Sequence, residues 1–261
     1  MNILDKIVAH KKNEVEYCKS NTSVSQLENS IFFSRATNAL AANLKNENSS
    51  GIIAEFKRKS PSKGIINDAF SSLEVVKAYE NAGVAGSSVL TDEAFFGGTQ
   101  QDLISVRNDV SIPLLRKDFM IDEYQFIEAK SIGADVVLLI ASILTPKEVK
   151  DFTDLAKSLQ LEVLLELHDE TELNHVCHNV DMVGINNRNL KNFEVDIEQS
   201  IRMAEKLGND FVKVAESGIS NIETLQLFKQ NGFQGFLIGE NFMKTTNPGL
   251  ACSEFIHSLK S

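Results

Sequence analysis

Short β-branched runs alternate with longer amphipathic segments along most of this sequence, and that alternation limits the fold more than any other feature. Helical segments are expected at 71–82, 122–132, 146–159, 169–179, 197–207 and 222–231, and glycines at 83, 133, 208 and 232 mark helix ends. Strands are expected at 52–57, 87–91, 113–118, 135–141, 162–167, 182–188, 211–216 and 235–239. Eight such repeats predict a parallel sheet closed as a (β/α)8 TIM barrel.

An open, doubly wound sheet is the alternative arrangement of the same elements. No GxGxxG opens its first unit and no GxxxxGK[ST] occurs in the sequence, so the barrel is favoured. The 261 residues fit a single TIM-barrel domain, 1–261. Within it, 1–50 is expected to be an N-terminal helical extension and 51–261 the barrel. Ile3, Ile7 and Val15 share one face at helical spacing, which predicts helix through about the first 45 residues.

Composition excludes several classes of protein. The net charge of −10 argues against nucleic-acid binding, which needs a basic face. No apolar run approaches the ~20 residues of a membrane span, and the charged N-terminus is unlike a secretory signal. The three cysteines are far apart, which predicts no disulfide and a reducing, cytoplasmic setting. A monomer is expected, because no apolar face stands out.

Charged residues follow the aliphatic part of several predicted strands. Side chains two apart on a strand share a side, so Glu55 lies on the same side as Lys57. Lys117, Glu166 and Glu216 end the third, fifth and seventh strands, and alternate strands of a barrel fill the same layers. A single charge at a strand end is usually solvated, but a set with inward phase predicts one site for proton transfer at the C-terminal rim.

Other charged residues near the rim are interpreted differently. Arg58 and Lys59 are out of phase or at a turn, and they are predicted to be surface or loop charges. His175 and His178 share a helix face, but their helix is polar and remote from the rim, so no metal site is expected. His168 follows Glu166 and is interpreted as part of a loop beside the site.

Glycine-containing segments follow the last two predicted strands. Backbone N–H groups at Gly218, Gly239 and Glu240 can point at one anion, helped by a short helix after Gly239. Loops at these positions frequently bind phosphate in this fold. A Phe95–Gly98 turn after the second strand is either plain packing or a cover for an aromatic substrate.

Seven segments together resemble one known family. "IIAEFKRKSPSKG", "SVLTDEAFFGG", "PLLRKDFMID", "VLLEL", "VGINNRNL", "VAESGI" and "FLIGENFM" are similar to indole-3-glycerol phosphate synthase of tryptophan biosynthesis, in the same order over nearly the whole chain. "ILDKIVAHKKNEV" is similar to that family's helical extension. The resemblance implies a lyase that closes a ring on 1-(2-carboxyphenylamino)-1-deoxyribulose 5-phosphate with loss of carbon dioxide and water. It implies no cofactor and no metal, and a monofunctional chain without a fused isomerase.

The resemblance also implies roles for individual residues. Lys117 would be the general acid, and Glu166 would transfer a proton, most plausibly in the dehydration. Lys57 would bind the substrate carboxylate or act as a second acid, with Glu55 orienting the lysines. The remaining implied site residues bind or enclose the substrate: Ser60, Pro61, Phe96, Asn186, Arg188 and Glu216 along the pocket, and Ser217, Gly218, Gly239 and Glu240 around the phosphate. The segment after Lys57 is interpreted as a closing lid.

Two other functions are compatible with part of the pattern. A phosphoribosylanthranilate isomerase would use a cysteine near the first strand and an aspartate on the fifth, and neither is present. A non-catalytic phosphate-binding barrel would not need Lys57, Lys117 and Glu166 together.

Overall fold

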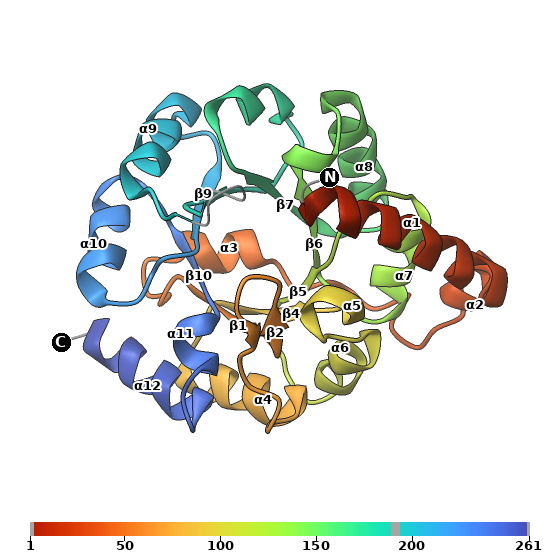
Figure 1. Cartoon of the computed structure of the whole chain (residues 1–261), viewed down its shortest axis with the longest axis horizontal. Coiled ribbons are helices and arrows are strands. Elements are labelled where there is room, and N and C mark those ends of the chain that lie inside the picture. The colour runs from red at the N-terminus through yellow and green to blue at the C-terminus, as the bar shows by residue number, and fades with distance from the viewer. Residues whose placement is uncertain (1–2, 189–193, 260–261) are drawn as a thin grey trace.

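Eight parallel strands close into a barrel in the computed structural model, which describes residues 3–188 and 194–259 (Figure 1). Each strand pairs in parallel with the strand on either side. This confirms the predicted TIM barrel. In order around the barrel, the strands are β1 (Ile52–Phe56), β4 (Gly86–Leu90), β5 (Leu114–Lys117), β6 (Val136–Ile140), β7 (Glu162–Leu167), β8 (Met182–Asn186), β9 (Val212–Glu216) and β10 (Gly235–Ile238).

Helices connect successive strands and form the outer ring seen in Figure 1. They bury apolar side chains against the outside of the barrel, where Phe126, Phe152 and Phe228 lie in one cluster. In chain order the outer helices are α4 (Ser72–Ala82), α6 (Gln100–Arg107), α7 (Tyr124–Ser131), α8 (Pro146–Ser158), α9 (Ile197–Leu207), α10 (Ile222–Gln230) and α12 (Pro248–Leu259).

Two of these connections differ from the sequence-based expectation. Helix α6 was not predicted, although Thr99 and Asp102 form a capping box at its start. The α-helix predicted at 169–179 is wrong, because this connection is a 3₁₀ helix, η2 (Glu170–His175). Asp169 caps η2 by accepting a hydrogen bond from the Thr171 N–H, and Val176 is already extended, so the helix ends before His178.

The N-terminal segment contacts both ends of the barrel. It forms α1 (Ile3–Asn21), α2 (Val24–Glu28) and α3 (Leu40–Lys45), and residues 30–39 between them contain no helix, in contrast to the continuous helical stretch predicted. In α3, Leu40 and Leu44 enter the barrel's inner core, where Ile7 of α1 also lies. Glu162, at the start of β7, accepts hydrogen bonds from the N–H groups of Leu40 and Ala41 and so fixes α3 beneath the strands.

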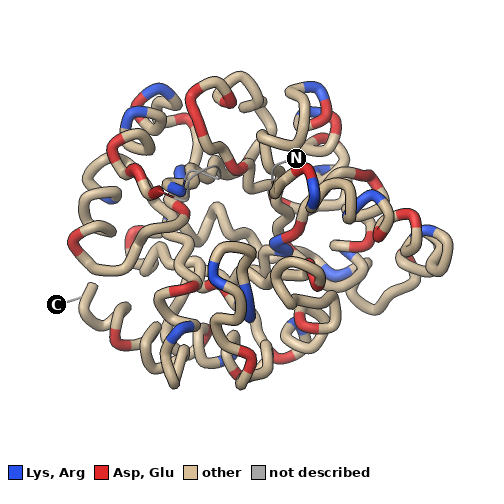
Figure 2. The backbone as a smooth tube through the Cα atoms, in the orientation of Figure 1, with Lys and Arg blue, Asp and Glu red and all other residues tan. Residues whose placement is uncertain are grey.

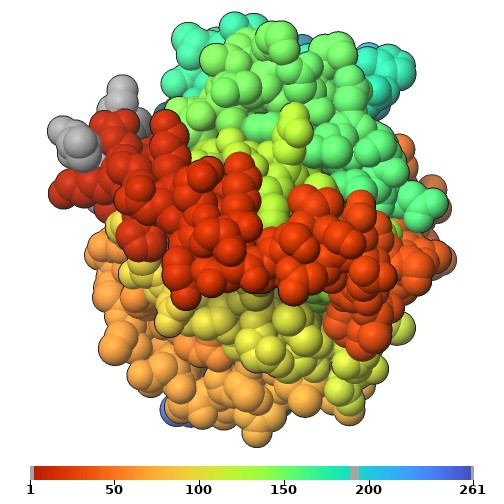
Figure 3. Space-filling view, turned by 90° about the vertical axis from the view of Figure 1, so that its right-hand side faces the viewer, coloured from red at the N-terminus to blue at the C-terminus, as the bar shows by residue number. Residues whose placement is uncertain are grey.

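Glycines at the N-terminal ends of two strands make room for α3. A Cβ at Gly86 would lie 2.7 Å from Leu40 Cδ1, and one at Gly235 would lie 3.1 Å from Leu44 Cδ1. Figure 3 shows the N-terminal segment, in red, lying across the flank of the molecule over the segments coloured yellow and green. The extension and the barrel therefore share one inner core.

Short elements surround the opposite, C-terminal end of the strands. They are the antiparallel hairpin β2 (Lys59–Ser60) and β3 (Gly64–Ile65), α5 (Glu93–Phe96), η1 (Ala141–Ile143) and α11 (Glu240–Met243). The turn expected at Phe95–Gly98 is thus a one-turn helix that ends at Gly97, whose φ is +68°. Acidic and basic residues are mixed around the periphery, with others at the barrel mouth (Figure 2). Among the described helices, none has the length and apolar character to cross a bilayer.

Candidate active site

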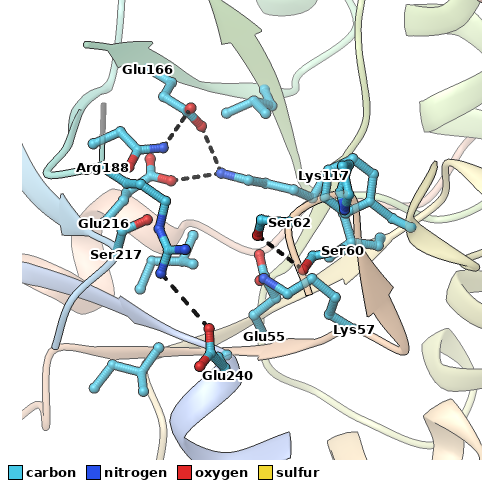
Figure 4. Close-up of a pocket in the computed structure, with 18 of the residues that line it drawn as sticks. Glu55, Lys57, Ser60, Ser62, Lys117, Glu166, Arg188, Glu216, Ser217 and Glu240 are labelled. Carbon is cyan, nitrogen blue, oxygen red and sulfur yellow. Dashed lines mark hydrogen bonds and ion pairs between the residues drawn. The ribbon is translucent and has the colours of Figure 1, made fainter. Parts of the chain in front are cut away.

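A cavity of about 330 Å³ opens at the C-terminal ends of the strands. Its wall contains all fourteen residues predicted for the site: Glu55, Lys57, Ser60, Pro61, Phe96, Lys117, Glu166, Asn186, Arg188, Glu216, Ser217, Gly218, Gly239 and Glu240. Figure 4 shows the labelled side chains converging from several strands and loops. The residues that the sequence predicted for the site therefore lie around one cavity.

Lys117 lies at the centre of the charged side chains. It ends β5, and its Nζ is 2.8 Å from Glu166 Oε2 and 2.6 Å from Glu216 Oε2 (Figure 4). Burial works against the charge of the ammonium, but the facing carboxylates outweigh it and raise the pKa of Lys117 above its ordinary value. Lys117 is therefore protonated at neutral pH and can serve as a proton donor in contact with two bases.

The two carboxylates that contact Lys117 differ in proton affinity. Burial opposes the charge of Glu166, but Lys117 and then His168 hold the pKa of Glu166 well below its usual range. Burial and the nearby charge of Glu166 raise the pKa of Glu216 to about 7. Two adjacent carboxylates with separated pKa values are the arrangement by which a site holds a base beside an acid.

A glycine opposite Glu216 leaves its carboxylate room to lie deep in the cavity. A Cβ at Gly184, on β8, would be only 2.2 Å from Glu216 Oε1. That oxygen is buried and lacks a hydrogen-bond partner among the described residues, while Oε2 contacts Lys117. An unpaired buried oxygen disfavours the charged form, which agrees with the raised pKa of Glu216.

A second ion pair lies at the end of β1. Lys57 Nζ is 2.5 Å from Glu55 Oε1, and Ser88 Oγ is 3.4 Å from the other carboxylate oxygen of Glu55. Glu55 fits against the backbone of Gly239, where a Cβ would lie 2.7 Å from Glu55 Oε1. The two-residue spacing on the strand thus gives the shared orientation that the sequence predicted.

The β2–β3 hairpin covers one side of the mouth. Ser60, Pro61 and Ser62 line the cavity, and Lys63 Nζ lies 2.5 Å from Glu240 Oε1. Arg58 lies in the loop after β1, in agreement with the prediction of a surface or loop charge, but the sequence did not indicate that its guanidinium donates two hydrogen bonds of 2.6 Å to Asp102. This fork ties the base of the hairpin to the start of α6 and compensates the partly buried charge. Neighbouring Lys59 donates to a surface carbonyl, as a loop charge would.

Backbone geometry is unusual at the turn after β9. Ser217 and Gly218 both have positive φ, of 66° and 74°. Successive backbone N–H groups of a turn can form a concave site in which an anion binds. The Asn187 side chain holds the turn by donating a hydrogen bond of 2.7 Å to Ser217 O.

The start of α11 faces the same end of the cavity as the β9 turn. Gly239 is the N-cap of α11, and Glu240 begins it. Arg188 Nη2 lies 3.8 Å from Glu240 Oε2, as marked in Figure 4. The predicted short helix after Gly239 is confirmed. The last two residues of the VGINNRNL segment, 189 and 190, lie outside the described residues.

Sequence analysis missed the apolar wall of the cavity. Ile3, Leu4 and Ile7 of α1 line it, together with Phe119. The helical spacing of Ile3 and Ile7 was visible in the sequence, but it did not say what the face would cover. Phe96, predicted at the rim, packs beside Phe119 with ring centroids 6.0 Å apart, so the wall presents an aromatic surface.

A buried lysine holds this apolar wall together and was also missed. Lys11 of α1 is fully buried, and its Nζ lies 2.8 Å from Asp118 and 3.0 Å from Asp92. These aspartates in turn accept hydrogen bonds from the N–H groups of Phe119 and Phe95. One ammonium therefore connects α1 to both aromatic segments of the wall.

Among residues 3–188 and 194–259, no group of three or more His, Cys, Asp or Glu side chains is placed to hold a metal ion. The ring nitrogens of His175 lie within hydrogen-bond distance of the carbonyl oxygens of Glu172 and Leu144, which act as acceptors, and His178 contacts Asn179. His168, by contrast, lines the cavity, with Nε2 3.1 Å from Glu166 Oε1.

Comparison with known proteins agrees with this geometry. A sequence model described as "Indole-3-glycerol phosphate synthase" matches residues 4–255. The chain belongs to the indole-3-glycerol phosphate synthase family. A relative with that name from Bacteroides thetaiotaomicron is 46% identical over 99% of both chains. Another, from Campylobacter fetus, is 42% identical over 93% of this chain and 94% of its own.

Solved structures similar to this member of the synthase family show the shared fold. Tryptophan synthase subunit alpha from Legionella pneumophila superposes with a TM-score of 0.61 at 11% identity, over 85% of this chain and 95% of its own. A chain of the Pyrococcus furiosus tryptophan synthase complex gives 0.62 at 14% identity, over 81% and 98%. At such identities the likeness extends to the barrel alone.

Proposed function

We propose that the cavity converts 1-(2-carboxyphenylamino)-1-deoxyribulose 5-phosphate to indole-3-glycerol phosphate, with Lys117 as the general acid. The observation that carries the proposal is the Lys117 ammonium held between the carboxylates of Glu166 and Glu216. Family membership supports a decarboxylating ring closure in tryptophan biosynthesis. The wall offers the three surfaces that the substrate requires: anion-binding turns, an aromatic face and paired charges.

Ring closure needs an electrophilic carbonyl carbon. Lys117 donates a proton to the sugar carbonyl oxygen, and the aromatic carbon bearing the carboxylate attacks the carbonyl carbon. Loss of carbon dioxide then returns the electron pair of the broken bond to the ring. A protonated lysine is suited to the first step because its neighbouring carboxylates keep it charged within a buried site.

Dehydration needs a base and an acid in turn. Glu166 removes a proton from the methylene carbon beside the nitrogen, while the hydroxyl formed in the first step leaves as water. The low pKa of Glu166 keeps it ionised and ready to accept that proton. Asn186 donates a hydrogen bond of 3.0 Å to Glu166 Oε1, which orients the carboxylate.

Opposite ends of the cavity bind different parts of the substrate. The N–H groups at Ser217, Gly218, Gly239 and Glu240 hold the phosphate, and Arg188 shapes that end. At the other end, Lys57 and Ser60 bind the substrate carboxylate, with Glu55 orienting Lys57. Phe96 covers the aromatic ring, and Pro61 stiffens the hairpin that closes over it.

Other features of the chain support a single-domain enzyme that acts on a small molecule without a cofactor. We infer that residues 1–261 act as one domain, because Leu40 and Ile7 of the extension share the inner core of the barrel. The proposed steps move protons and carbon dioxide only, so they need no cofactor. The net charge of −10 supports a small-molecule partner rather than nucleic acid, and three free cysteines support a cytoplasmic setting. A monomer remains our proposal for the assembly.

An indole fluorescence assay tests the function. The chain contains no tryptophan, so the fluorescence of the product rises from a low background. We expect purified protein to form indole-3-glycerol phosphate, and Lys117→Ala to lower kcat at least ~100-fold while the protein stays folded. Near-normal turnover by Lys117→Ala would refute the role of Lys117, and an inactive wild-type protein would refute the function.

A further inference from the structure

The proposed reaction consumes a proton from outside the site in every cycle. The substrate carboxylate leaves as neutral carbon dioxide and gives its electron pair to the ring. The carbonyl oxygen leaves as water and takes two protons, of which the methylene carbon beside the nitrogen supplies one. The amine keeps its own proton, so the other must come from solvent. This inference rests on the proposed function.

The acid and the base lie where solvent has little access. The side chain of Lys117 is 13% exposed, and that of Glu166 is 7% exposed. A substrate in the cavity covers both from the mouth, because both line the same wall as the binding residues. A second route for protons is therefore required if the acid is to be restored promptly after each cycle.

His168 connects Glu166 to the molecular surface. It follows β7 directly, and its Nε2 is 3.1 Å from Glu166 Oε1. On the other side of the ring, Nδ1 lies 3.1 Å from Ser142 Oγ, and Ser142 on η1 is exposed. Glu166 in turn lies 2.8 Å from Lys117. Ser142, His168 and Glu166 therefore lie in series between solvent and Lys117, with 2.8–3.1 Å between successive polar atoms.

The backbone of His168 is held on both sides. Its main-chain N–H donates a hydrogen bond of 2.6 Å to Glu172 Oε2, and its main-chain carbonyl accepts one from the Gln199 side chain. Ser142 donates its hydroxyl proton to Glu172 Oε1 at 2.5 Å, so its oxygen is free to accept from His168 Nδ1. Nε2 has no hydrogen-bond partner of good geometry among the described residues, and its nearest acceptor is the Glu166 carboxylate.

We propose that His168 is the residue through which the site takes up the proton that each turnover consumes. The imidazolium gives its Nε2 proton to Glu166 Oε1, and Glu166 passes a proton through Oε2 to Lys117. Water at the exposed Ser142 side then recharges the ring, which returns to its starting state. No oxidant or other reactant takes part.

The charges around the ring favour the imidazolium. Burial lowers the pKa of His168, but Glu166 on β7, Glu172 on η2 and Glu216 on β9 outweigh burial and raise it above its ordinary value. Asp169, the next residue in the chain, also interacts with the charge of His168. The raised pKa of His168 favours the imidazolium, which can exchange its proton with solvent.

The rate of the first turnover distinguishes proton uptake through His168 from a direct role of His168 in the chemistry. A variant lacking His168 begins with Lys117 already protonated, so its first turnover needs no uptake. With His168→Gln we expect a first turnover within about 3-fold of wild type and later turnovers at least ~10-fold slower. Rapid-mixing fluorescence then shows a burst of one product per enzyme. A first turnover slowed as much as the later ones would overturn the proposal.

Small buffers provide a second readout that a structural role would not move. In His168→Ala, steady-state kcat should rise with imidazole concentration at fixed pH, while wild-type kcat stays constant. Ser142→Ala, at an exposed position, should give a smaller loss that buffer also restores. Steady-state rates in both His168 variants that equal wild type, or losses that no buffer restores, would overturn the proposal.

Matched controls keep the result distinct from failure of the function. His175→Gln alters a histidine at the end of η2, the 3₁₀ helix that carries Glu172, and its ring lies against main-chain carbonyls instead of lining the cavity. It should show neither the burst nor the buffer effect. Wild-type protein that makes no indole product would refute the function itself, before His168 is tested.

Discussion

Glu216 makes the stability of this protein depend on pH, and replacing it by glutamine removes that dependence. The Glu216 side chain is 2% exposed, and its pKa is raised to about 7, against an ordinary 4.5. Each pKa unit corresponds to ~1.36 kcal/mol, so the ionised form is disfavoured in the folded protein by about 3 kcal/mol. Glutamine has the shape of the neutral acid and avoids this penalty.

The direction of the effect follows from where the proton binds more tightly. The folded protein holds the Glu216 proton up to about pH 7, whereas the unfolded chain releases it near 4.5. Wild-type protein therefore loses stability as pH rises between these values. Relative to wild type, we expect Glu216→Gln to gain about 1 kcal/mol in the free energy of unfolding at pH 5 and about 3 kcal/mol at pH 8.

Urea denaturation at the two pH values measures this difference. Groups that do not interact with Glu216 titrate alike in both proteins and cancel in the comparison. Glu223→Gln, at an exposed position at the start of α10, is the control and should show the same small difference at both pH values. If the gap between Glu216→Gln and wild type is the same at pH 5 and pH 8, the buried carboxylate of Glu216 is not the cause. Activity should fall in Glu216→Gln even though stability rises.

Two further predictions concern the wall and the phosphate end. Lys11→Met should cost about 3–5 kcal/mol of unfolding free energy, because it removes the ammonium that the buried Asp92 and Asp118 share and leaves Asp118 with Arg116 alone. Exposed Lys12→Met is the control, and equal urea midpoints would contradict the prediction. Gly218→Val should raise KM at least ~10-fold with kcat little changed, by obstructing the anion-binding turn. Gly208 has a similar positive φ but lies away from the cavity, so Gly208→Val is the control. An unaltered KM in Gly218→Val would show that the phosphate binds elsewhere.

Local periodicity explains why the barrel and its mouth could be predicted. Alternation along a strand fixes which side chains face inward, so Glu55 and Lys57 could be oriented without knowledge of their partners. Strand count then placed Lys117 and Glu166 in one layer. Their 2.8 Å contact is a consequence of barrel closure, which the spacing of the repeats implies.

The contacts that the sequence did not reveal are those between residues far apart in the chain. Lys11 looked like one charge among several on an amphipathic helix, and its burial depends on aspartates about a hundred residues away. The partner of Arg58 was missed for the same reason, since its two hydrogen bonds to Asp102 depend on how α6 packs. Helix α6 itself had a readable signal in the Thr99 capping box, but few apolar positions followed it.

The N-terminal segment contacts both ends of the barrel, and this affects the order of folding. A ribosome releases residues 3–45 first, yet α3 is capped by Glu162, 122 residues after Leu40, and lies against Gly235 near the end of the chain. Contacts so distant in sequence form late and slowly. The nascent extension must therefore wait, with its apolar face uncovered, until almost the whole polypeptide has been made.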